Sequence, residues 1–263
     1  MRVRRGHTLV EALCALALGG VLAAASGLAL TSARAALERA EARELGGRAE
    51  REAAGIVGKA IASGAHLEQL GDTAVELDVL IATGVVCATE LRAVVLPALR
   101  PQSGSVPTAV ALFPAPDDIV EIRQFGSVAG GAWWSALVDS AAERKLSVHC
   151  RAEDGWRDAT DDAPLLRLVV GDTVPAELEP GAEIRVLRRG RFALYHAGKG
   201  EWVLGWRRCH PYGGTCSSIQ PVAGPLRAPS AGGFRILRDE AAGIWAVQSV
   251  GVGGRGARTE VPR

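Results

Sequence analysis

The stretch GHTLVEALCALALGGVLAAASGLAL, residues 6–30, decides the fold of the front of the chain. Its apolar part, Leu9–Leu30, has 22 residues and contains one charged side chain, Glu11. As an α-helix it would be about 33 Å long, which is enough to cross a bilayer core. The preceding residues 1–6, MRVRRG, carry three arginines. Basic residues before an apolar run predict a membrane helix whose N-terminus lies in the cytoplasm.

Two other interpretations of this stretch remain open. A buried helix of a soluble protein would normally show an amphipathic stripe, and none is visible here. A conventional signal peptide, cleaved after Ala25 in the Ala23–Ala25 run, also fits the basic start and the apolar segment. Glu11 argues against it, because a carboxylate inside lipid costs a few kcal/mol and marks a functional position.

Residues Gly6-His7-Thr8-Leu9-Val10-Glu11 resemble the processing site of type IV prepilins and type II secretion pseudopilins, with His7 in place of the usual Phe. The resemblance implies cleavage after Gly6 by a prepilin peptidase and N-methylation of His7. It also implies that Glu11 meets the N-terminal amine of a neighbouring subunit and sets the filament register.

The same resemblance implies partners and a location. The partners would be prepilin peptidase, a major pilin, other minor pilins or pseudopilins, an inner-membrane assembly platform and, before assembly, membrane lipid. The protein would cross the inner membrane once, with its body in the periplasm, and then enter a periplasmic or cell-surface filament. Thirty Lys and Arg against 29 Asp and Glu leave a net charge of +1, so no specific nucleic-acid partner is expected.

The helical pattern continues after residue 31 with a different composition. Five arginines and five glutamates lie between Ser32 and Glu52, and Arg34–Glu38, Glu44–Arg48 and Arg48–Glu52 are opposite charges four residues apart. We therefore expect a leader at 1–6, a membrane or filament-core helix at 7–31 and an amphipathic continuation at 32–65. Gly46-Gly47 should weaken or kink the helix.

The body, residues 74–250, should be mostly antiparallel sheet, so the fold class is α+β and pilin-like. All 12 aromatic residues lie at or after Phe113, and 32 glycines and 13 prolines favour many turns. We expect a strand break at Thr83-Gly84, a loop at 97–107, a strand at 145–150, a turn at Gly190 and a final hairpin ending at Val250. The segments 183–205, 220–226 and 233–235 more loosely resemble the larger minor pilins and J-type minor pseudopilins.

The five cysteines divide by position. Cys14 should be an inert thiol in the apolar helix. Cys209 and Cys216 flank a Pro/Gly-rich loop and should form a disulfide, and Cys87 and Cys150 would then pair by elimination. A zinc site made of Cys209, His210 and Cys216, with His149, is the alternative.

No catalytic constellation and no cofactor site emerge from the sequence. Gly251–Gly256 matches G-x-G-x-x-G, but we expect a flexible tail over 251–263 because no helix is expected to follow the motif. The acidic segment 153–162 is expected to be a solvated loop, with calcium binding as the alternative. We therefore expect a minor pilin or minor pseudopilin without enzymatic activity. The rival functions are a secreted periplasmic binding protein with a signal peptide cleaved after Ala25 and an exported enzyme.

Overall fold

The structure is a computed structural model that describes residues 9–97, 99–101, 113–123, 132–144, 165–198, 200–213 and 215–262. The cleavage residues Gly6 and His7, the expected strand at 145–150 with His149 and Cys150, and the acidic segment 153–162 lie outside them. The described elements are α1 (Leu9–Ser63), β1 (Leu67–Gln69), β2 (Ala74–Val85), β3 (Ala88–Glu90), β4 (Ala93–Leu96), β5 (Leu99–Pro101), β6 (Ile119–Arg123), β7 (Trp133–Arg144), β8 (Leu165–Val170), β9 (Glu183–His196), β10 (Trp202–Arg208), β11 (Gln220–Leu226), the 3-10 turn η1 (Pro229–Ala231), β12 (Phe234–Asp239), β13 (Ile244–Ser249) and β14 (Ala257–Pro262).

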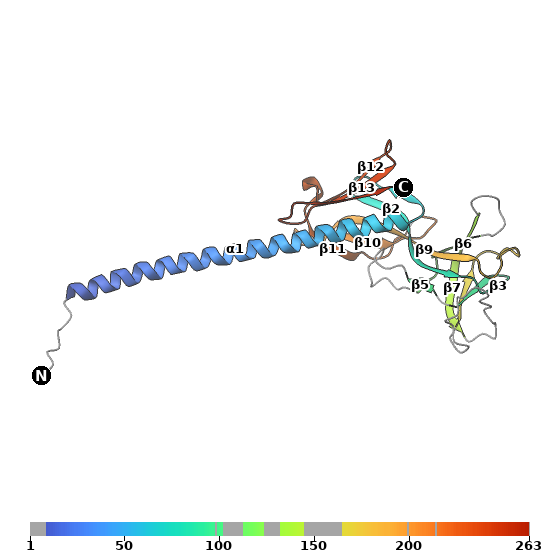
Figure 1. Ribbon diagram of the computed structural model, residues 1–263, viewed down its shortest axis with the longest axis horizontal. Coiled ribbons are helices and arrows are strands. Elements are labelled where there is room, and N and C mark those ends of the chain that lie inside the picture. Colours follow the sequence, from blue (N-terminus) through green and yellow to red (C-terminus); the bar gives the residue numbers. More distant parts are fainter. Residues whose placement is uncertain are drawn as a thin grey trace.

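Helix α1 and an antiparallel sheet body confirm the predicted α+β, pilin-like fold (Figure 1). The helix has 55 residues, or about 82 Å at 1.5 Å per residue. Its C-terminal end packs on the body, and the rest projects away from it. It runs unbroken through Gly46-Gly47, where weakening or a kink was expected, because the body contacts it there.

Strand β9 organises the body. Along one edge it pairs with β2 from Ala74↔Ala193 to Val85↔Glu183. Along the other edge its first part pairs with β6 and its second part with β10. The sheet therefore divides into two lobes that share β2 and β9. One lobe adds β1, β10 and β11, and the other adds β6, β7, β8, β4 and β3.

Each lobe has its own apolar core. The proximal core joins the buried face of α1, including Val57 and Ile61, to Phe192, Trp206 and the three-stranded sheet β12-β13-β14. The distal core is formed mainly by the branched side chains of β4, β6, β8 and the first part of β9. None of the described residues of the distal core belongs to the helix, and the strands that form this core lie beyond the end of α1 in Figure 1.

Several expected turns are strands in the structure. Strand β9 continues through Gly190, because this residue lies against the Trp206 indole and a Cβ there would overlap the ring. Strand β2 likewise continues through Thr83-Gly84, and Leu99–Pro101 pairs with it as β5. These elements depend on strands distant in sequence, so local turn residues did not reveal them.

The end of the chain also differs from the expectation. Residues 251–262 were expected to form a flexible tail, yet Gly251 bridges to Leu226 and β14 pairs with β13 from Ser249↔Ala257 to Ile244↔Pro262. The final hairpin is thus a three-stranded sheet. Thr259 and Val261 of β14 lie next to Gly58 of the helix, so this sheet covers one face of α1.

Candidate assembly helix and its attachment to the body

The apolar part of α1 is exposed although its side chains are large. Leu16 is 74% exposed and Leu28 is 73% exposed, and the other leucines and valines described between Leu13 and Leu30 are more than half exposed. The body covers none of them, as Figure 1 shows. Among the described residues, one helix is long and apolar enough to span a membrane, and it is α1. Such a surface requires lipid or other helices around it.

The predicted assembly residues lie at the start of this helix. Glu11 belongs to the first turn of α1, and Cys14 is a free, exposed thiol as predicted. Gly6 and His7 precede the described residues. Cleavage after Gly6, methylation of His7 and the role of Glu11 therefore stay predictions.

Farther along α1, small residues attach the helix to the body. Ala49, Ala53, Val57 and Ala60 are buried on one face, which allows the sheet to approach closely. At Gly46 the backbone of Val252 comes so near that a Cβ would overlap its carbonyl group. Sequence reasoning treated Gly46 as a weak point of the helix, whereas the structure uses it as a contact point.

The only buried carboxylate described on α1, Glu50, fastens this contact. Its Oε1 accepts hydrogen bonds from the backbone N–H of Gly251 (2.8 Å) and of Gly256 (2.9 Å). The Ser249 hydroxyl donates to the Glu50 backbone carbonyl at 2.6 Å. Gly254 lies so close to the carboxylate that a Cβ would overlap it. The G-x-G-x-x-G segment thus surrounds a carboxylate of its own chain, as glycine-rich loops surround anions in other proteins.

The disulfide between Cys209 and Cys216 is present, with Cα atoms 4.0 Å apart, which confirms that prediction. It removes both thiolates from the alternative zinc site, and the described residues contain no metal-binding group of three or more ligands. Cys87 is disulfide-bonded as well. Its predicted partner, Cys150, lies outside the described residues.

Buried ion pairs lie in the part of the sheet where the two lobes meet. Arg188 donates to Asp118 at 2.7 and 2.5 Å, and both side chains are almost fully buried. Arg189 donates to Asp78 at 2.7 and 2.8 Å, and this hydrogen bonding raises the pKa of the guanidinium. Both arginines lie on β9 where the sheet divides. The Arg189–Asp78 pair joins the two strands that both lobes share. Asp118 links the lobes, because Arg208 of β10 also donates to it at 3.2 Å.

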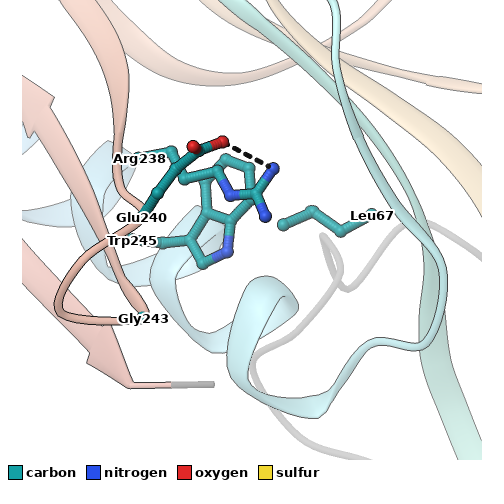
Figure 2. Close-up of a pocket in the computed structure, with 5 residues that line it drawn as sticks. All are labelled: Leu67, Arg238, Glu240, Gly243 and Trp245. Carbon is teal, nitrogen blue, oxygen red and sulfur yellow. Dashed lines mark ion pairs between the residues drawn. The ribbon is translucent and has the colours of Figure 1, made fainter.

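Two places in the body combine titratable side chains with burial or a cavity. Burial raises the pKa of the Glu121 carboxyl group. The positive charge of Arg185 opposes this rise, and the negative charge of Asp78 adds to it. Asp78 is itself already paired with Arg189. The cavity in Figure 2, about 270 Å³, has Trp245 and Leu67 as apolar lining, with Arg238 ion-paired to Glu240 at its rim. It holds neither a nucleophile nor paired carboxylates among its lining residues, so it gives no support to an exported enzyme.

Comparison with known proteins gives one match. The family model for the prokaryotic N-terminal methylation motif matches residues 1–27, which include the Gly6–Glu11 hexapeptide and most of the apolar run. No curated protein and no solved structure matches the chain. The motif supports a protein of the type IV prepilin or pseudopilin type, and with the apolar helix it fits a single-pass, membrane-anchored protein.

Proposed function

We propose that this chain, which is of the type IV prepilin or pseudopilin type, is a minor pilin or minor pseudopilin. Its function would be that of a structural subunit of a type IV pilus-like or type II secretion filament. One observation carries the proposal: a long apolar helix, joined to the methylation motif, projects uncovered from a folded body. Membrane lipid would cover this helix before assembly, and helices of neighbouring subunits would cover it afterwards.

The minor role is proposed from the shape of the body. The proximal lobe already covers the attached part of α1, and the distal lobe extends beyond it. This second lobe adds surface away from the helix, which suits contacts with other minor subunits. The remaining proposed partners are prepilin peptidase, a major pilin and the inner-membrane assembly platform.

The first step proposed is cleavage between Gly6 and His7 by prepilin peptidase, followed by N-methylation of His7. Mass spectrometry of the mature N-terminus tests it, and His7 with or without a methyl group is the expected first residue. Gly6→Phe should leave an uncleaved precursor in the membrane. A mature chain starting at Ser26 would instead reveal a conventional signal peptide and refute the pilin function.

Glu11 is proposed to pair with the N-terminal amine of a neighbouring subunit, because each of the two charges is costly alone within lipid. Glu11→Ala should therefore leave the body folded and the membrane level unchanged while reducing filament incorporation. The measurement compares the membrane fraction with sheared filaments from the same cells. Glu38→Ala, which changes an exposed carboxylate of the same helix, controls for loss of charge alone.

A further inference from the structure

The cavity shown in Figure 2 lies between strand β1 and the hairpin of β12 and β13. It has a volume of about 270 Å³, and its lining residues are Leu67, Arg238, Glu240, Gly243 and Trp245. Trp245 belongs to the proximal core, and Leu67 packs against that core. The cavity is therefore a place where the apolar interior of the body opens to solvent.

The strand arrangement explains why this space is open. Strand β1 pairs with β2, and β12 pairs with β13, so the cavity lies between two different sheets. The sheets are linked at Ile236, whose N–H donates to the Asp72 carbonyl at 2.8 Å and whose carbonyl accepts from the Gln69 side chain at 3.0 Å. Beyond this link β12 borders the cavity instead. Gly243, with φ of 63°, turns the hairpin at one end and adds no side chain there.

The inner wall of the cavity is apolar and aromatic. Trp245 is only 6% exposed, and Leu67 is partly buried. The Arg238 guanidinium carbon lies 5.5 Å from the centre of the indole ring, and Figure 2 shows this side chain and Leu67 beside the indole. An apolar group that entered the cavity would exchange water for contacts with Trp245 and Leu67.

The rim of the cavity carries one positive and one negative group. Arg238 and Glu240 form an ion pair at 3.5 Å, and their side chains are 56% and 79% exposed. An exposed pair of this kind contributes little free energy, so both groups can turn toward a ligand at small cost. A ligand with a single charge would be attracted by one of them and repelled by the other. A ligand that carries both charges would be attracted by both.

The separation of the two rim charges selects the kind of zwitterion. In an α-amino acid the ammonium nitrogen and the carboxylate oxygens are attached through one carbon and lie about 3 Å apart. This separation is close to the 3.5 Å between the Arg238 and Glu240 atoms, whereas the two ends of a peptide lie farther apart. The volume is also below the range of about 300–1,000 Å³ that is typical for drug-sized ligands, so a smaller molecule fits better.

We propose that this cavity binds a free α-amino acid with an apolar side chain. The carboxylate of the ligand would accept hydrogen bonds from Arg238, and its ammonium group would donate to Glu240. The apolar side chain would lie against Trp245 and Leu67. This site gives the body a ligand-binding role in addition to the proposed structural one. It does not depend on that function, because the hairpin lies over the attached end of α1, away from the projecting apolar part (Figure 1).

Ligand-observed NMR titration of the full chain in lipid nanodiscs tests the ligand class, with empty nanodiscs as the blank. The probe is L-leucine, and we expect saturable binding with a Kd of about 1 mM or lower. Three analogues each remove one feature: 4-methylpentanoate lacks the ammonium group, 3-methylbutylamine lacks the carboxylate, and glycine lacks the apolar side chain. Each should bind at least about tenfold more weakly. Absence of saturable leucine binding, or equal binding of any analogue, would overturn the proposal.

Substitutions at the rim test the place of binding. Arg238→Gln and Glu240→Gln should each weaken leucine binding at least about tenfold, and both residues are exposed, so the fold should be kept. Arg258→Gln and Glu260→Gln are the matched controls. These two residues form an exposed ion pair with the same spacing on β14 and do not line the cavity, so leucine binding should not change.

Two results would overturn this placement. One is unchanged leucine binding in both rim variants, and the other is an equal loss in the β14 variants. Thermal unfolding of all four variants beside the wild type verifies that each is folded. The mature N-terminus tests the proposed filament function separately, so the failure of one proposal leaves the other standing.

Discussion

The two parts of helix α1 share one secondary structure and have opposite surroundings. From Leu13 to Leu45 the large apolar side chains are more than half exposed, whereas from Gly46 to Ile61 one face is buried in the body. The first part is apolar on all sides up to Leu30, and the second combines a face of small residues with a charged face. A helix that is apolar all round needs lipid or other helices, and an amphipathic helix needs only one packing surface.

This difference separates folding from assembly along a single helix. The attached part of α1 belongs to the proximal core and should determine whether the body folds. Among the described residues, the projecting part meets the body near its end, where Gly253 approaches Ala42 and Arg43, so its earlier side chains are free to serve a membrane or a filament. Substitutions on the two sides of Gly46 should therefore affect different measurements.

The largest effect should come from truncation on either side of this boundary. Removing residues 1–44 should leave a body that unfolds cooperatively on heating. Removing residues 1–63 also removes Val57 and Ile61, whose burial contributes about 1.5–3 kcal/mol each, along with the alanines between them. That loss is comparable to the whole stability of a domain, about 5–15 kcal/mol, so the shorter chain should not fold. Equal melting temperatures would contradict the division.

Single truncations of side chains should reproduce the contrast at smaller scale. Ile61→Ala leaves a cavity in the proximal core and should cost about 2–5 kcal/mol. Leu37→Ala removes an exposed side chain and should change the free energy of unfolding by less than about 0.5 kcal/mol. Urea unfolding of the full chain in detergent measures both. A similar loss for the two variants would mean that the projecting part also stabilises the body.

The carboxylates of the helix offer a third comparison. Glu50→Ala deprives the N–H groups of Gly251 and Gly256 of their acceptor and should cost about 2–3 kcal/mol. Glu44→Ala removes an exposed carboxylate without an ion-pair partner among the described residues and should be nearly neutral. Limited proteolysis should also cut the segment 251–262 sooner in Glu50→Ala, because this acceptor holds the glycine-rich loop against the helix. Unchanged proteolysis would indicate that β14 pairing alone holds the segment.

The features that sequence predicted correctly depend on neighbouring residues. The apolar run, the hexapeptide ending at Glu11 and the loop between Cys209 and Cys216 each occupy a short stretch, so local composition was sufficient. The antiparallel body followed from many short β-branched segments. The unbroken course of strand β9 could not be predicted in this way, because the need for glycine at position 190 comes from Trp206 of the next strand and not from its sequence neighbours.

The attachment of the helix was missed for the same reason. Glu50 looked like one more charge on an amphipathic helix, and Gly251–Gly256 looked like a loose tail. Only the fold brings these segments, about 200 residues apart, into hydrogen-bonding distance. The sequence offered two signals of this attachment. One was the carboxylate of Glu50 close to the small residues Ala49 and Ala53, and the other was the regular spacing of the glycines in Gly251–Gly256.

The smallest expected effect lies at the boundary itself, where two adjacent glycines should respond in opposite directions. A Cβ at Gly47 would meet the Arg51 guanidinium at 3.6 Å, an ordinary contact, so Gly47→Ala should stabilise the chain by about 0.5–1 kcal/mol through helix propensity. A Cβ at Gly46 would overlap the Val252 backbone, so Gly46→Ala should give a net loss of about 1–2 kcal/mol despite the same gain in propensity. Thermal unfolding of both variants beside the wild type measures the difference. If both alanines stabilise the chain, the helix and the glycine-rich loop do not pack closely at Gly46, and the attached part of α1 begins later than the structure indicates.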